Sequence, residues 1–292
     1  MANHPRLTPD EEVKESFKCE QSPAYFIHNY CMVEDKSPDV LDWIPFHLWP
    51  AQQTVLGQIL ANLLIIILKA RQLGLSWPVL GYALWLLLFR PGSQVLMFSR
   101  RDDEAIELLE RLKGMHQHLP PFLQAKIGED NDHTLEFVKL GSLARSFPTT
   151  KDSGRSYTAT LVIIDEADFI QWLKQLITAV KPTIDGGGQL IMISTSNKEL
   201  PQSEFKRLWK AGHAQLNRYL AIFLPWSARP GRTQAWYENQ ATDYEEDDLH
   251  QEYPATPEEA LAPRSAAMRF QPALIKHVRD IQPHIEVADA TT

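Results

Sequence analysis

Cysteine is scarce in this sequence, and long apolar runs are absent. Only two cysteines, Cys19 and Cys31, occur in 292 residues, and they do not form a metal-ligand pattern. This argues against a disulfide framework and favours a reduced, cytoplasmic setting. The two most apolar stretches, 63–68 and 79–89, are both shorter than the roughly 20 residues that a membrane-spanning helix needs. The N-terminus is polar and acidic, so we expect neither a signal peptide nor a membrane partner.

Basic residues are also in the minority. Lysine and arginine number 29 against 37 acidic residues, which gives a net charge of -8. This balance excludes a protein that is coated in base for static wrapping of DNA. It leaves room for a motor that touches nucleic acid through a few local loops. At 44% hydrophobic residues, the chain can bury the core of one large α/β domain or of two smaller ones.

Two polar clusters are candidates for a metal site. His116 and His118 have no thiol or acidic motif with metal spacing beside them, so we expect no zinc there. The acidic run at 243–248 is compatible with a metal site, but such a run more often begins a solvated helix.

The segment 161–168 reads LVIIDEAD and carries the clearest chemical signal. Four apolar residues, suited to a buried strand, end at two carboxylates, Asp165 and Glu166. Ligands of open α/β sheets bind at the carboxyl ends of the strands, and Mg²⁺ prefers oxygen ligands. A neighbouring carboxylate can activate a water for attack on a phosphoryl group. The alternative is structural, because Asp165 or Asp168 could cap a helix that runs through 169–173.

A phosphate-binding loop would complete this signal, and 69–76, KARQLGLS, is the candidate. It follows an apolar run and precedes a helical pattern, as a phosphate cradle requires. The usual pattern has lysine before the final Ser or Thr, but this chain has Leu75 there. Lys69 and Arg71 are the two cations in the loop. Taken alone, the segment also fits a basic turn between a strand and a helix.

From about residue 49, apolar runs alternate with helical patterns. Strands are expected at 63–68, 94–99, 161–164 and 189–194, and helices at 52–59, 77–88, 102–118 and 169–180. Residues 133–147 predict a hairpin around 140–142. Such alternation indicates right-handed βαβ units and a largely parallel sheet, hence an α/β fold.

Three further segments fit a nucleotide site. Gln52, just before the loop strand, carries an amide that can donate a hydrogen bond to an adenine edge and accept one from it. Hydroxyls at 194–196, after the last expected strand, could sense the terminal phosphate. Arg155, ahead of the Asp-Glu pair, could neutralise charge in the transition state. Each has a plain structural alternative, such as loop capping for the hydroxyls.

In chain order these segments resemble the large terminase subunit of tailed bacteriophages, the ATPase that drives DNA packaging into a procapsid. The resemblance runs from about 49 to 261, and EYPATPEEA at 252–260 is similar to the segment that closes the family's ATPase region. It implies a RecA-like (ASCE) P-loop ATPase with a mainly parallel central sheet flanked by helices, plus a small N-terminal helical subdomain. It also implies ATP and Mg²⁺ as cofactors.

The resemblance implies a role for each matched residue. ATP would contact Gln52 (or Gln53) at the base and, in the loop, Lys69, Ala70, Arg71, Gln72, Leu73, Gly74, Leu75 and Ser76. Mg²⁺ would be held by Asp165 and Ser76, whereas the catalytic residues would be Glu166, Arg71 and Arg155. Arg155 would act in cis or on the next subunit. Coupling would use Ser194, Thr195 and Ser196. Candidate DNA contacts are Arg100, Arg101, Lys198, Lys206, Arg207 and Lys210, for which ordinary surface charge is the alternative.

The same resemblance predicts the organisation and partners. Residues 1–45 would form the N-terminal helical subdomain or lid, 46–262 the ATPase domain, and 263–292 a linker towards a nuclease domain whose acidic cluster does not occur in this sequence. Partners would be double-stranded DNA, the portal ring, the small terminase subunit and further copies in a ring. The protein would work in the host cytoplasm at the portal. The alternatives are a helicase-like translocase outside packaging, and a degenerate, non-hydrolysing DNA-binding or assembly module, which Leu75 favours.

Overall fold

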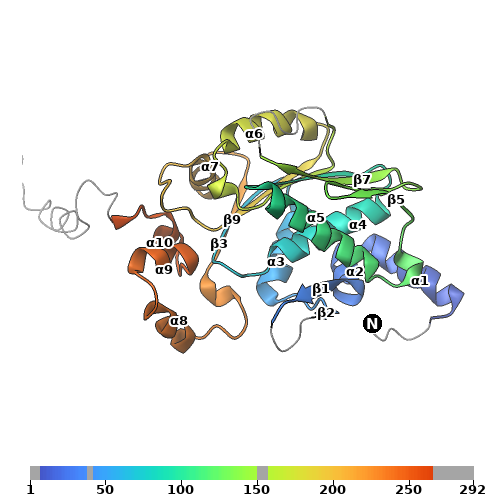
Figure 1. Ribbon diagram of the computed structural model, residues 1–292, viewed down its shortest axis with the longest axis horizontal. Helices are drawn as coiled ribbons and strands as arrows, with labels where there is room; N and C mark the ends of the chain where they lie inside the picture. Colours follow the sequence, from blue (N-terminus) through green and yellow to red (C-terminus); the bar gives the residue numbers. More distant parts are fainter. Residues whose placement is uncertain (1–6, 38–41, 150–156, 266–292) are drawn as a thin grey trace, which may run out of the picture.

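A computed structural model describes residues 7–37, 42–149 and 157–265 (Figure 1). Its centre is an eight-stranded sheet in the order β10-β3-β9-β8-β4-β7-β6-β5. The strands from β10 to β7 are parallel to one another, and β6 and β5 extend the sheet as antiparallel neighbours. The bounds are β3 (Leu64–Lys69), β4 (Gln94–Ser99), β5 (Ile127–Asn131), β6 (Thr134–Phe137), β7 (Ser142–Pro148), β8 (Leu161–Ile164), β9 (Gln189–Ser194) and β10 (Leu220–Leu224).

A small antiparallel hairpin and a set of helices surround this sheet. The hairpin is β1 (Met32–Asp35) with β2 (Asp42–Pro45). The α-helices are α1 (Pro9–Gln21), α2 (Pro23–Tyr30), α3 (Pro50–Ala61), α4 (Ser76–Phe89), α5 (Asp102–Gln117), α6 (Leu173–Val180), α7 (Glu204–His213), α8 (Gln234–Ala241), α9 (Glu246–Glu252) and α10 (Pro257–Leu261). Short 3-10 turns are η1 (Pro121–Leu123), η2 (Ala167–Phe169), η3 (Lys181–Ile184) and η4 (Trp226–Ala228).

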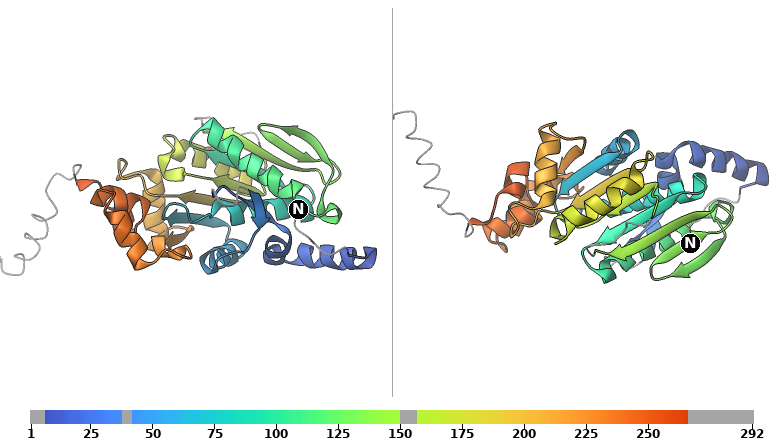
Figure 2. Two further views of the ribbon diagram at one scale, coloured as in Figure 1. Left: turned by 60° about the horizontal axis from the view of Figure 1, so that its bottom comes forward. Right: turned by 90° about the horizontal axis from the view of Figure 1, so that it is seen from above.

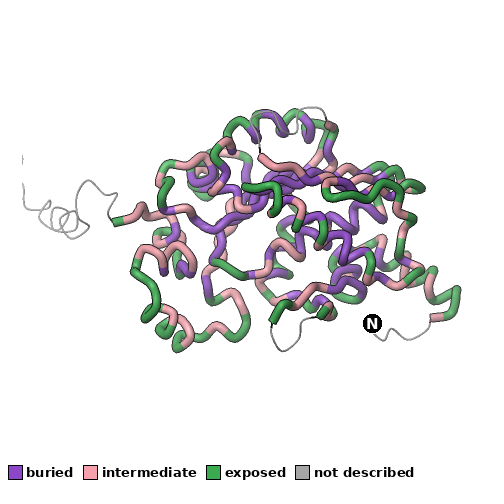
Figure 3. Tube along the Cα trace, viewed as in Figure 1, coloured by how far each residue is buried: buried purple, intermediate pink, exposed green. Residues whose placement is uncertain are grey.

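The central strands are buried on both faces, which explains their continuous apolar sequences. All six residues of β3 are buried. Because side chains alternate along a strand, Ile65 and Ile67 belong to one hydrophobic cluster, and Ile66 and Leu68 to the other. The burial-coloured trace shows the central strands of the sheet as buried, and the hairpin at its outer edge as more exposed (Figure 3).

Different helices supply the two clusters. α2, α3, α4 and α5 contribute to the first, and α6 and α7 cover the opposite face with residues such as Leu176, Phe205 and Trp209. α2 lies against α4 because Gly81 has no side chain there; a Cβ would meet Ile27 at 2.9 Å. The helices α8, α9 and α10 gather at one end of the molecule, and α1 lies at the other (Figure 2). In the described residues, no helix has the length and apolarity to cross a membrane.

Most expected elements are confirmed, with one clear correction after β8. The hairpin at 133–147 forms from β6 and β7, and the acidic run at 243–248 leads into α9 as a helix start. The helix expected at 169–180 begins only at Leu173, because the chain first makes the 3-10 turn η2. Neither Asp165 nor Asp168 therefore caps a helix through 169–173. Both carboxylates are used elsewhere.

Candidate nucleotide site

The site lies where the carboxyl ends of three adjacent parallel strands meet. β9 pairs with β3 on one side and with β8 on the other. Lys69 ends β3, Ser194 ends β9, and Asp165 directly follows β8. The sheet therefore brings together three segments that are far apart in the sequence.

The loop between β3 and α4 is shaped by two left-handed residues and two apolar anchors. Gln72 and Gly74 have φ of 57° and 61°. Leu73 and Leu75 are each only 2% exposed and belong to the hydrophobic core. Leu75 thus fastens the loop to the core. The side chain in the usual lysine position therefore packs in the hydrophobic core.

Gln52 holds this loop from the side. Its amide nitrogen donates to the carbonyls of Leu73 at 3.1 Å and Gly74 at 3.3 Å, and its amide oxygen accepts the N–H of Trp49 at 3.1 Å. Both amide hydrogens and the oxygen are engaged, and the side chain is 3% exposed. In this structure the amide positions the loop, and the role of Gln52 in reading adenine stays a prediction. The alternative, Gln53, is exposed and donates to the Leu48 carbonyl.

Two carboxylates and one buried lysine form the centre of the site. Asp165 Oδ2 accepts the Ser76 hydroxyl at 3.0 Å, and the Glu166 N–H donates to Oδ1 at 3.1 Å. Lys69 Nζ lies 3.6 Å from Glu166 Oε1. Burial raises the pKa of Asp165 and the charge of Glu166 raises it further, against the opposite effect of Lys69. A further positive charge beside Asp165 and Glu166 would therefore stabilise their charged forms.

Glu166 stands in a backbone conformation that side chains rarely adopt. Its φ and ψ are 48° and 42°, in the left-handed region. Such a conformation costs of order 1 kcal/mol or more and is typical of functional sites. It turns the chain sharply after β8 and leaves the Glu166 side chain 35% exposed beside the buried Asp165.

Arg71, the second cation of the loop, is paired with the C-terminal helices. Its guanidinium contacts Glu252 at 2.9 Å, and its N–H donates to the Glu252 carbonyl at 2.7 Å. Glu252 raises the pKa of Arg71. The structure thus separates the two cations, with Lys69 beside the carboxylates and Arg71 on Glu252.

Two arginines that the sequence reading missed also contact the loop. Arg229 donates to the carbonyl of Gln72 at 3.1 Å, and Arg232 donates to that of Arg71 at 3.0 Å. Burial and the neighbouring Arg229 lower the pKa of Arg232 to about 10. Recognising 220–224 as a further parallel strand would have placed the segment after it at this edge of the sheet.

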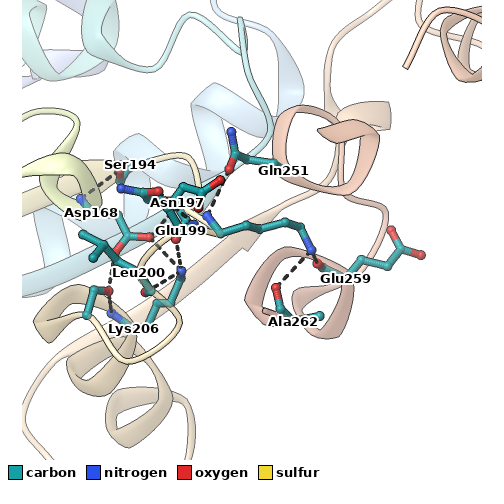
Figure 4. A network of polar contacts seen from close by, with 11 residues as sticks. Asp168, Ser194, Asn197, Glu199, Leu200, Lys206, Gln251, Glu259 and Ala262 are labelled. Carbon is teal, nitrogen blue, oxygen red and sulfur yellow. Dashed lines mark hydrogen bonds and ion pairs between the residues drawn. The ribbon is translucent and has the colours of Figure 1, made fainter. Parts of the chain in front are cut away.

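The loop after β9 is bonded to the segment after β8 (Figure 4). The Ser194 hydroxyl accepts the N–H of Asp168 at 3.0 Å, and Asp168 accepts the N–H of Asn197 at 2.6 Å and the Ser203 hydroxyl. Thr195 and Ser196 are buried, and the Ser196 hydroxyl has no hydrogen-bond partner within the described ranges. We call residues 194–198 the coupling loop.

Two predicted DNA contacts are wrong for this conformation. Lys198 and Lys206 are each 1% exposed. The ammonium group of Lys198 donates to the carbonyls of Glu259 at 2.8 Å and Ala262 at 3.0 Å. That of Lys206 donates to Asn197 and Leu200 and lies 3.4 Å from Asp168. Both lysines hold the coupling loop in place, so neither presents charge to a nucleic acid.

The other four candidates for DNA contact remain exposed. Arg100 and Arg101 follow the carboxyl end of β4, on the same edge of the sheet as the site, and pair with the neighbouring acids Glu104 and Asp103. Arg207 pairs with Glu204 on α7, where Lys210 is also exposed. Arg155, the predicted arginine finger, lies outside the described residues.

Comparison with known proteins agrees with this geometry. The family model described as terminase large subunit, T4likevirus-type, N-terminal, matches residues 66–267. The large terminase ATPase domain of Thermus phage P74-26 is similar in structure, with a TM-score of 0.54 and 20% identity over 72% of this chain and 93% of that one. The HK97 bacteriophage large terminase gives a TM-score of 0.57 and 17% identity, over 79% of this chain.

A third similar structure is the large terminase of a thermophilic bacteriophage in complex with ADP, with a TM-score of 0.57 and 12% identity over 72% of this chain. The chain matches 50% of the HK97 protein and 53% of the thermophilic phage protein, about half the length of each. At these identities the likeness shows the shared fold.

Proposed function

Because the chain belongs to the T4likevirus-type family of large terminase subunits, we propose that it hydrolyses ATP and uses the energy to move double-stranded DNA into a procapsid. One observation carries the proposal. Ser76, Asp165 and Glu166 converge at the carboxyl ends of adjacent parallel strands, with the buried Lys69 beside them. ADP and ATP-gamma-S are bound in structures of the thermophilic phage terminase, which supports nucleotide as the ligand of this edge.

The donor set fits a magnesium ion that is bound through nucleotide. Ser76 and Asp165 offer hydroxyl and carboxylate oxygens 3.0 Å apart, and the pKa of Asp165 is raised first by burial and then by the neighbouring charge of Glu166. Within the described residues, no group of three or more acidic, histidine or cysteine side chains could hold a metal alone. This suits Mg²⁺, which commonly takes one or two protein oxygens and completes its shell with phosphates and water. When bound, the ion would neutralise phosphate charge.

The residues of the chain divide the reaction between them. Lys69 binds phosphate oxygens, and backbone N–H groups of the loop and the start of α4 face them. Glu166 orients a water and accepts its proton as the water oxygen bonds to the terminal phosphorus. The bond from that phosphorus to the bridging oxygen breaks, and ADP leaves with the bond's electron pair. Arg155, in cis or from a neighbouring copy, would stabilise the charge that develops.

The wider assignment follows the family. DNA and the packaging machinery are the expected partners, here the portal ring, the small terminase subunit and further copies of the chain in a ring, in the host cytoplasm at the portal. Arg100 and Arg101 are the exposed cations at the edge that holds the site. The position of Leu75 does not favour a degenerate module, because its side chain serves the core while the catalytic carboxylates are both present.

Replacing Glu166 tests the proposal. Glu166→Gln keeps the size of the side chain but cannot accept a proton, so we expect ATP binding to persist while turnover falls at least about 100-fold. Binding is measured by calorimetry and turnover by phosphate release, with and without DNA. The control Asp185→Asn changes an exposed acid just before β9, at the other end of that strand, and should match the parent. Turnover by Glu166→Gln at the parental rate would refute the assignment.

A further inference from the structure

The N-terminal β1–β2 hairpin is fixed to the molecule by one tryptophan. The hairpin lies against α2 and α5 (Figure 1). Trp43, on β2, fills a notch in α5 at Gly114, where a Cβ would meet the Trp43 ring at 2.3 Å. One turn later His118 stacks on the same ring, with centroids 4.4 Å apart. Lys36, just after β1, lies 3.6 Å from Glu107 of α5. The hairpin therefore has a defined seat on α5.

From this seat Trp43 reaches the start of α4. Its ring meets that of Trp77 edge to face, with centroids 5.8 Å apart and an angle of 87°. Arg111 of α5 also contacts Trp77, with its guanidinium carbon 5.6 Å from the ring centroid. Trp77 directly follows Ser76, whose hydroxyl donates to Asp165 at 3.0 Å. One contact thus separates the hairpin from a residue of the nucleotide site.

The first turn of α4 depends on packing because it has no cap. Within the described part of the chain, no side chain caps the N-terminus of α4, and its first turn has no acidic residue. The N–H groups of such a turn have no partner inside the helix and can face phosphates. Side-chain contacts then fix the direction of the turn. Leu75 supplies them from the core, and Trp77 supplies them towards α5 and the hairpin.

The end of the hairpin that carries Trp43 also faces the phosphate loop. Hydrogen bonds from Ser37 lower the pKa of Asp35, at the end of β1, and the charge of Arg229 lowers it further. Arg229 in turn donates to the carbonyl of Gln72 in the loop. The hairpin therefore lies beside both the loop and the helix that follows it.

We propose that Trp43 is a positioning residue for the nucleotide site. Through Trp77 it fixes the first turn of α4, and so sets where Ser76 presents its hydroxyl and where the N–H groups of that turn point. The proposal rests on the ATPase function proposed above. It gives the N-terminal hairpin, which contributes no strand to the central sheet, a part in nucleotide binding.

The affinity of the folded protein for a non-hydrolysable ATP analogue with Mg²⁺ tests the proposal by calorimetry. Trp43→Leu keeps an apolar side chain in the notch but loses the contact between the rings. We expect its affinity to fall about two- to tenfold, the contribution of one aromatic pair. Trp43→Phe keeps a ring beside Trp77 and should restore most of the parental affinity. Gly114→Ala displaces Trp43 without altering it and should bind as weakly as Trp43→Leu.

Two controls separate positioning from a general loss of stability. Phe26→Leu removes a buried ring that packs on Phe89, at the opposite end of α4, and should bind like the parent although urea unfolding shows it to be less stable. Gly57→Ala adds a Cβ on α3 where no atom lies within 4 Å, and should also bind like the parent.

Parental affinity in folded Trp43→Leu and Gly114→Ala would overturn the inference, as would an equal loss of affinity in Phe26→Leu. Either result would leave the ATPase function in place, because the parent would still bind nucleotide. A parent chain that binds no nucleotide would overturn both proposals.

Discussion

Leu75 stands where phosphate loops commonly carry lysine, yet its side chain lies in the core, 2% exposed. Lys69, at the other end of the loop, lies 3.6 Å from Glu166. Lys69→Met should therefore weaken ATP-analogue binding about 10- to 100-fold, the effect of losing a charged hydrogen-bond donor. Leu75→Met conserves volume and should bind like the parent, whereas Leu75→Ala would confound the comparison by leaving a cavity. Titration calorimetry measures the affinity of both Met variants for the ATP analogue. Equal affinities would show that Lys69 does not bind phosphate.

The role of a residue could be predicted from sequence where the residue directly follows a buried strand, because that position places it at the carboxyl edge of the sheet. Asp165 follows an apolar run, and its place at the sheet edge follows from that pattern alone. The sequence predicts Lys198 and Lys206 as DNA contacts, but in the structure their acceptors are mostly backbone carbonyls. For Lys198 these belong to residues of the distant α10 segment. No local pattern indicates such a partner.

Whole elements were predictable in proportion to their burial. β4 and β9 form over the expected residues because both are continuous apolar runs, buried on both faces. β10 lies at the edge of the sheet and every residue is only partly buried, but its sequence LAIFL is also an apolar run and was not assigned as a strand. The arginines that follow it were therefore not placed at the site.

The phosphate loop is an element whose shape depends on a glycine. Gly74 has a φ of 61°, and a Cβ there would lie 3.1 Å from the Gln52 amide nitrogen that holds the loop. Gly92 has a φ of 81° with no atom within 4 Å of a Cβ, so it provides a matched control. Alanine at either position should cost about 1–2 kcal/mol of unfolding free energy from backbone strain. Only Gly74→Ala should also weaken nucleotide binding, as measured by calorimetry beside urea unfolding; the same binding loss in Gly92→Ala would contradict this account.

The whole molecule carries a net charge of -8, so DNA must approach a locally basic region. Arg100 and Arg101 are exposed cations at the carboxyl edge of the sheet, and DNA would have to compete there with their partners Glu104 and Asp103. Each phosphate contact contributes about 0.9 to the slope of log affinity against log salt.

The double variant Arg100→Gln/Arg101→Gln should therefore weaken DNA binding at low salt and reduce that slope by about 2. Lys174→Gln/Lys181→Gln removes the same charge from α6 and η3, which cover one face of the sheet, and should leave the slope unchanged. Fluorescence anisotropy with a short duplex at several salt concentrations measures both variants. An equal loss of slope in the two would mean that DNA responds to net charge rather than to this edge. ATP hydrolysis without DNA should stay parental in both, because neither pair contacts the carboxylates of the nucleotide site.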